Sequence, residues 1–122
     1  MTALTLDQAR RIARGLEDRE QARHGGTRHE ARARLARRIG VMPGTLFNLA
    51  RDRLKRLDDT IRARLVAYAV RDLEAEIERL NHELEMARSL GMAPNAELVQ
   101  AITTVLNRAQ ALHAEATDGL TT

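Results

Sequence analysis

Apolar side chains recur every three or four positions in several separate stretches of this 122-residue chain. That is the spacing of one face of an α-helix, and it predicts an all-α protein. The apolar face of the first stretch holds Ala9, Ile12, Ala13 and Leu16. The residues that follow, up to the break at Gly25 and Gly26, are polar, so the far end of this helix is expected to project from the fold or to fray.

Local chemistry marks where the first helices begin. Thr5 is followed three residues later by Gln8, and Thr27 is followed in the same way by Glu30. Each pair can form a capping box, in which the threonine accepts from one backbone N–H and the Gln or Glu accepts from another. Helices are therefore expected to begin after both threonines. The second helix is predicted from about Arg28 to Ile39, and the third from about Pro43 to Arg51.

A much longer helix is predicted after Asp58 and Asp59, whose carboxylates suit the positive end of a helix dipole. No helix breaker follows until Gly91, so residues 59–90 are expected to form one helix about 47 Å long. Its early apolar residues are expected to close the N-terminal core: Ile61, Leu65, Val66 and Ala69. Its later ones alternate by three and four like a coiled-coil seam: Val70, Leu73, Ile77, Leu80, Leu84 and Ala87.

The last predicted helix follows a break at residues 91–95 and repeats the same spacing through Leu98, Ile102, Val105, Ala109, Leu112 and Ala116. The two seams predict an antiparallel helical hairpin, and Val99 and Leu106 add apolar width that suits a four-helix bundle with a second copy. The alternative is a monomer whose hairpin folds back on the N-terminal part. The residues expected to form the dimer are Leu73, Ile77, Leu80, Leu84, Leu98, Ile102, Val105, Leu106 and Leu112.

The stretch from Arg32 to Arg51 places small and flexible residues where two closely crossing helices need them. Ala36 supplies a small side chain at a helix contact, and Gly40 tolerates the positive φ of a tight turn. Pro43 lies just inside the next helix, where its missing N–H costs nothing. The positions expected to be buried around this turn are Leu35, Ile39, Val41, Leu46 and Leu49.

These residues resemble the helix-turn-helix domains of the phage repressor and Cro type, and the resemblance covers roughly residues 5–70. It implies that the helix from Pro43 is a recognition helix that enters the major groove of DNA. The groove-facing residues that it implies are Pro43, Gly44, Thr45, Phe47, Asn48 and Arg51. The residues that it implies for phosphate contacts are Arg28, Arg32, Arg53, Lys55 and Arg56.

Two residues of this helix suit the reading of bases. Asn48 can form two hydrogen bonds with adenine, and Arg51 can pair with guanine or with phosphate. Thr45 or Phe47 can contact a thymine methyl group. Two other interpretations stay open, since Phe47 also suits the core and Asn48 also suits a solvated helix face.

The segment departs from the family pattern where the recognition helix begins. Met42 stands where a serine or another capping residue is usual, which forfeits about 1 kcal/mol of capping. Pro43 and Gly44 then offer few side-chain donors. Base reading is therefore expected to lie later in the helix, toward Asn48 and Arg51, or to depend on DNA shape.

Charge divides the chain in two. Residues 1–57 hold 14 Lys or Arg against 6 Asp or Glu, a net +8, whereas residues 58–122 hold 6 against 11, a net −5. A basic part joined to an acidic part indicates that the first meets a polyanion. Nineteen of the twenty cations are arginine, the residue suited to phosphate and guanine, although a GC-rich genome also favours arginine. Arg37 and Arg38 have an alternative use in ion pairs with acidic residues of the first helix.

Catalysis has little support in the sequence. There is no glycine-rich phosphate loop or nucleophile motif, and His24, His29, His82 and His113 lie apart from one another, so we expect no catalytic residue, metal, cofactor or small-molecule ligand. The chain lacks cysteine, an apolar run long enough to span a bilayer and the apolar core of a signal peptide. A cytoplasmic, nucleoid-associated protein is therefore expected.

Together these patterns predict a helix-turn-helix domain at residues 1–70, a dimerising hairpin at residues 71–116 and a disordered tail at residues 117–122. The expected function is sequence-specific binding of double-stranded DNA by a homodimeric transcriptional repressor at an inverted-repeat operator. Two alternatives remain. One is a DNA-binding accessory protein of a plasmid or phage that acts in partition, conjugative transfer or packaging, and the other is a helical adaptor that does not bind DNA.

Overall fold

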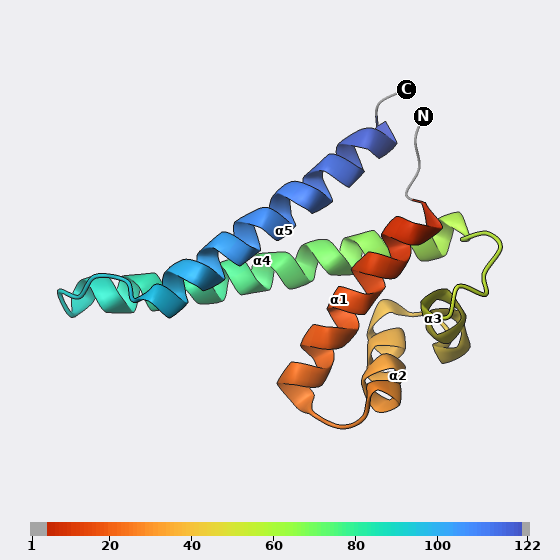
Figure 1. The fold of residues 1–122 in the computed structure, drawn as a ribbon, viewed down its shortest axis with the longest axis horizontal. Coiled ribbons are helices and arrows are strands. Elements are labelled where there is room, and N and C mark those ends of the chain that lie inside the picture. Colours follow the sequence, from red (N-terminus) through yellow and green to blue (C-terminus); the bar gives the residue numbers. More distant parts are fainter. Residues whose placement is uncertain (1–4, 121–122) are drawn as a thin grey trace. The chain divides into compact units, whose positions relative to one another are not determined.

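The computed structural model describes the backbone of residues 5–120 and the side chains of residues 5–112, and within this range it contains helices and no strand. The five helices are α1 (Leu6–His24), α2 (Arg28–Ile39), α3 (Pro43–Ala50), α4 (Asp59–Ser89) and α5 (Ala96–Leu120) (Figure 1). The prediction of an all-α chain is confirmed. The chain divides into two compact units, residues 3–69 and residues 70–122, and the boundary falls within α4.

Both predicted capping boxes are present in the N-terminal unit, residues 3–69. The Gln8 N–H donates to the Thr5 hydroxyl at 3.1 Å, and the Thr5 N–H donates to the Gln8 side chain at 2.8 Å. The same reciprocal pair joins Thr27 and Glu30 at 3.1 and 2.9 Å. The hydrogen bond from the Thr27 backbone lowers the pKa of the Glu30 carboxyl. Helices α1 and α2 therefore begin where their own side chains satisfy the free N–H groups.

The turn between α2 and α3 has the predicted geometry. Gly40 has φ 87°, in the left-handed region, and the N–H groups of Gly40 and Val41 both donate to the Ala36 carbonyl, at 2.9 and 3.0 Å. Arg64, at the start of α4, donates to the Gly40 carbonyl at 2.5 Å. Gly40 thus ends α2 and turns the chain into α3, with the Ala36 carbonyl in the last turn of the helix satisfied.

The core of the N-terminal unit holds small and leucine side chains from all of its helices. Four of the five positions predicted to be buried around the turn are buried, while Val41 is half-buried. Of the residues predicted from the start of α4, Leu65 and Ala69 are buried, and Ile61 and Val66 are half-buried. The buried apolar set is Ala9, Ala13, Leu16, Ala31, Leu35, Ala36, Ile39, Leu46, Leu49, Leu57, Leu65 and Ala69.

The second half of α1 does not project or fray, so that expectation is wrong. The helix continues to His24, and the side chains of Glu17 and Glu20 are buried, with only 1 % and 3 % of their surface exposed. They continue the apolar stripe of Ala13 and Leu16 along the face that packs on α2. One face of the polar half of α1 is therefore buried in the N-terminal unit, while Asp18, Arg23 and His24 on its other faces are exposed.

In the C-terminal unit, residues 70–122, α4 and α5 pack together through Leu73, Leu80, Leu98 and Val105. Gly91 has φ 69° in the connection, and the Asn95 side chain accepts from the Leu98 N–H at 2.8 Å where α5 begins. Five partly buried residues surround this core: Leu84, Ala101, Ile102, Ala109 and Leu112.

The nine residues predicted to meet a second copy fall into three groups. Leu73, Leu80, Leu98 and Val105 are buried between α4 and α5 of one chain, as the seams of a hairpin require, and their part in a dimer stays a prediction. Leu84, Ile102 and Leu112 are half-buried around them, and Ile77 and Leu106 remain exposed. The backbone of α5 is helical to Leu120, beyond the predicted start of the tail at residue 117, and residues 121–122 lie outside the described part of the chain.

Candidate nucleic-acid interface

Helix α3 has a buried side and an open side, as its sequence predicts. Leu46 and Leu49 are buried in the core of the N-terminal unit. The remaining predicted reading positions lie on the open side, where Pro43, Gly44 and Arg51 are exposed and Thr45, Phe47 and Asn48 are half-buried. These six residues therefore lie on one side of the helix, opposite Leu46 and Leu49.

The start of α3 lacks a side-chain cap. Met42 occupies the N-cap position, is 74 % exposed and forms no capping hydrogen bond through its side chain, while Pro43 is in the first turn. The Thr45 N–H donates to the Met42 carbonyl at 3.0 Å. This confirms the predicted departure from a serine-capped start and leaves the open side of α3 with few donors before Asn48.

Phe47 lies close to two guanidinium groups, an arrangement that the sequence did not predict. Its ring centroid is 4.7 Å from the Arg51 guanidinium carbon and 5.7 Å from that of Arg32. Both distances fall within the range of cation–π attraction. A shallow hollow of about 250 Å³ adjoins the ring and is lined by His29, Arg32, Ala33, Pro43, Gly44 and Phe47. Phe47 is thus neither a core residue nor a free surface side chain, because it is half-buried and its ring contacts the guanidinium groups of Arg51 and Arg32.

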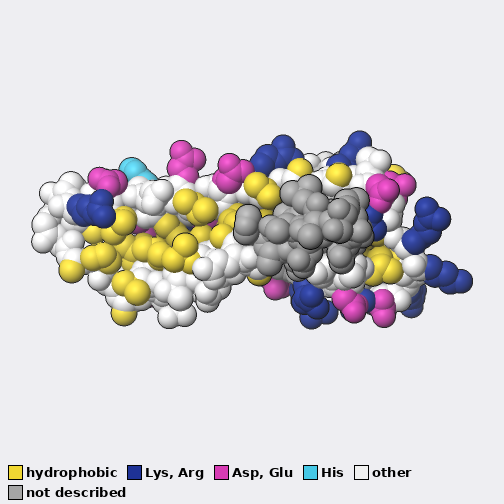
Figure 2. Space-filling model, turned by 90° about the horizontal axis from the view of Figure 1, so that it is seen from above, with side chains coloured by type: hydrophobic (Ala, Val, Ile, Leu, Met, Phe, Trp, Pro, Cys, Tyr) yellow, Lys and Arg dark blue, Asp and Glu magenta, His cyan; other side chains and the backbone are white. Residues whose placement is uncertain are grey.

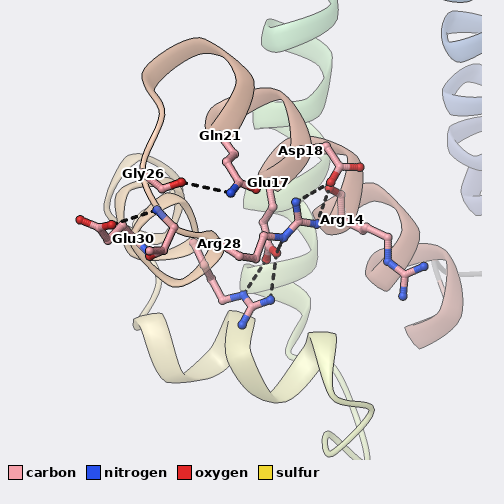
Figure 3. Close-up of polar contacts among 9 residues, drawn as sticks. Arg14, Glu17, Asp18, Gln21, Gly26, Arg28 and Glu30 are labelled. Carbon is pink, nitrogen blue, oxygen red and sulfur yellow. Dashed lines mark hydrogen bonds and ion pairs between the residues drawn. The ribbon is translucent and has the colours of Figure 1, made fainter.

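Arg28 and Arg32, both expected at phosphates, are engaged with a buried carboxylate. Arg32 donates from two nitrogens to the two oxygens of Glu17, at 3.0 Å each. Arg28 pairs with the same carboxylate at 3.1 Å and also with Asp18 (Figure 3). A buried carboxylate requires such partners, because an unpaired charge in the interior is costly. The structure therefore gives these two arginines a structural task within the N-terminal unit.

Glu20 forms a second cluster of the same kind one turn further along α1. Arg34 pairs with it at 3.0 Å and also donates to the Gly25 carbonyl at 2.7 Å. Arg38 is its other main partner. The alternative use of Arg37 and Arg38, in ion pairs with acidic residues of the first helix, is confirmed for Arg38. Arg37 is exposed and has no ion pair with a described residue.

The sequence itself contains a signal for these clusters. Glu17 and Glu20 follow Ala13 at helical spacing on the apolar face of α1. The second helix carries two arginine pairs at a spacing of four residues, Arg28 with Arg32 and Arg34 with Arg38. Two carboxylates on a buried stripe opposite two i, i+4 arginine pairs indicate internal ion pairing between neighbouring helices.

The cations after α3 differ from those of α2. Arg51, Arg53, Lys55 and Arg56 are exposed, and none forms an ion pair with a residue in the part of the chain whose side chains are described. The nearby carboxylate of Asp52 is bound by Arg10 at 2.6 Å, so it does not offset them. The predicted phosphate contacts thus separate into a neutralised pair on α2 and three exposed cations, Arg53, Lys55 and Arg56. Together with Arg51 these three form a free cationic segment at residues 51–56.

Among the described residues, we find no other candidate site as well defined as the open side of α3 and the cations that follow it. No group of three or more His, Asp or Glu side chains among the described residues is placed to hold a metal ion. None of the described helices combines the length and the apolar character that crossing a bilayer requires. Comparison of the chain with protein-family models, with curated proteins and with solved structures finds no match.

Proposed function

We propose that this chain binds double-stranded DNA in a sequence-specific manner, with α3 in the major groove, and that it acts as a transcriptional repressor. The observation that carries the proposal is the free cationic segment at residues 51–56, which directly follows the open side of α3. Ion pairs between α1 and α2 offset the charge of several arginines elsewhere in the N-terminal unit. The cations of residues 51–56 have no such partner, so their positive charge stays available beside the helix that presents Asn48.

The contacts divide between base reading and phosphate binding. Asn48 and Arg51 are adjacent on the open side of α3 by helical spacing, and cation–π contact with Phe47 restrains the Arg51 guanidinium. Arg53, Lys55 and Arg56 are exposed on the segment that leaves the helix and suit phosphate contacts, which set the register on DNA. Arg28 and Arg32 are omitted from the proposed phosphate contacts because Glu17 and Asp18 together offset their charge.

The proposal is tested by selecting bound duplexes from a library of random DNA. The wild-type chain is expected to enrich one motif, because Asn48 and Arg51 each discriminate between bases by about 1–3 kcal/mol. Arg51→Ala is expected to relax the motif at a single position. Arg71→Ala is the matched control, since Arg71 is an exposed arginine of the C-terminal unit and its loss should leave the motif unchanged.

Failure to enrich any motif would contradict sequence-specific binding. If random duplex and RNA compete equally well with every selected pool, the basic surface serves a polyanion without sequence preference, and the helical adaptor becomes the better account.

A further inference from the structure

One face of the C-terminal unit remains apolar after α4 and α5 have packed together. Leu98 and Val105 are buried against α4, but their neighbours Val99 and Leu106 are 51 % and 56 % exposed. On α4, Ile77 is 39 % exposed. Monomeric proteins expose single apolar residues routinely, whereas a continuous stripe of them marks an interaction surface. We call the surface formed by Ile77, Val99, Ile102 and Leu106 the open face.

The residues of the open face lie on one side of the helix pair. Val99, Ile102 and Leu106 share one stripe of α5, because they are three and then four residues apart. Each residue of the open face lies one or four positions after a buried seam residue, so it is rotated away from the seam in the same sense about its own helix axis. Because the two helices run antiparallel, this rotation brings the residues of both helices to the same side of the pair. Figure 2 shows hydrophobic side chains gathered over this unit, with acidic side chains along one edge.

The α5 part of the open face is almost free of charge. Arg108 is the only charged residue between Leu98 and Leu112, although 30 % of the chain is charged, and it pairs with Asp72 at 3.9 Å. Depletion of charged residues is the compositional mark of the centre of a protein interface. The Thr103 hydroxyl beside this stripe donates to the Val99 carbonyl at 2.9 Å, so a partner can cover it without leaving an unsatisfied donor.

Charge also restricts what can cover the open face. Residues 70–122 hold 4 Arg against 9 Asp or Glu, a net −5, which disfavours nucleic acid and anionic membrane surfaces. The uncharged stripe offers no ion pair to a strongly charged protein. A second copy of the same face fits, because its apolar and uncharged positions match those of the first. Pairing through α5 also leaves the acidic edge of α4 at the periphery of the interface.

We propose that the open face binds the same face of a second copy, so that the chain is a twofold homodimer held together through α5. Association itself does not require DNA. Only one consequence rests on the proposed function, namely that two copies of α3 address an inverted repeat with half-sites about 34 Å apart or a multiple of that distance.

The test is the molecular mass of the full chain in solution, measured by sedimentation equilibrium. The wild-type chain is expected at twice its mass of 13.7 kDa. Leu106→Glu is expected at 13.7 kDa, because it places two like charges at the centre of the interface. Since Leu106 is exposed, the variant should retain the helical circular dichroism of the wild-type chain. Val99→Glu, on the same stripe, provides a second variant with the same expected mass.

Met86→Glu is the matched control for these variants. Met86 is 52 % exposed but lies nine residues after Ile77, which places it on the opposite side of α4, so this variant should remain dimeric. A monomeric wild-type chain overturns the proposal, and so does a dimer that persists in both Leu106→Glu and Val99→Glu. A dimeric chain that selects no DNA motif would contradict the proposed function while leaving this interface in place.

Discussion

At the scale of single residues, the stability of the N-terminal unit depends on the ion pairs of Glu17 with two arginines. The family resemblance alone would make these arginines phosphate contacts. The Glu17 carboxylate is buried and is held by Arg28 and Arg32. Substituting either arginine removes a partner of a buried charge, so the loss of DNA binding in such a variant would not by itself identify a phosphate contact. The exposed cations of residues 51–56 do not carry this ambiguity.

We predict that Arg32→Ala lowers the free energy of unfolding by about 3 kcal/mol, at the low end for a broken buried ion pair, because Arg28 still faces Glu17. Arg53→Ala removes an exposed arginine and should change the same quantity by less than about 0.5 kcal/mol. Urea denaturation followed by circular dichroism measures both. Equal stability of the two variants would mean that the Glu17 cluster does not stabilise the unit.

At the scale of elements, the turn between α2 and α3 depends on the backbone of Gly40. A Cβ atom there would lie 3.3 Å from a guanidinium nitrogen of Arg64, and φ is 87°. We predict that Gly40→Ala lowers the free energy of unfolding by about 1–2 kcal/mol, because alanine pays the cost of a left-handed conformation.

Gly44→Ala is the matched control for this turn. Nothing lies within 4 Å of its added Cβ, and the position is helical, so alanine should raise stability by up to about 1 kcal/mol. Thermal unfolding of the two variants side by side distinguishes them. Destabilisation by both would show that the effect is not specific to the positive φ of Gly40.

The helices themselves were predictable because their signals are local. Thr5, Thr27 and Gly40 act through hydrogen bonds within a few residues, so the bounds of α1 and α2 follow from the sequence. The burial of Glu17 was not predicted, because it depends on how α1 and α2 align in space, and a polar side chain alone suggests solvent. The same reason explains the site: the open side of α3 follows from its own periodicity, whereas the neutralisation of Arg28 and Arg32 depends on another helix.

At the scale of the whole molecule, the division into a +8 part and a −5 part predicts strong salt dependence of DNA binding. We predict that Lys55→Ala weakens binding to all duplexes to a similar extent. It should also reduce the slope of log affinity against log salt concentration by about 0.9, the value for one lost phosphate contact. Titrations by fluorescence anisotropy at several salt concentrations measure the slope. An unchanged slope would remove Lys55 from the phosphate contacts, and Arg71→Ala should leave it unchanged.

The central claim is that α3 reads bases, and the most direct measurement is the ratio of affinities for the selected duplex and for a randomised duplex of the same length. The wild-type ratio is expected to be on the order of 10³ or more. Asn48→Ala removes no charge and should reduce the ratio by about 5- to 150-fold, whereas Asn81→Ala, on the exposed surface of α4, should preserve it. A wild-type ratio near one, or a ratio that Asn48→Ala leaves unchanged, would contradict the claim.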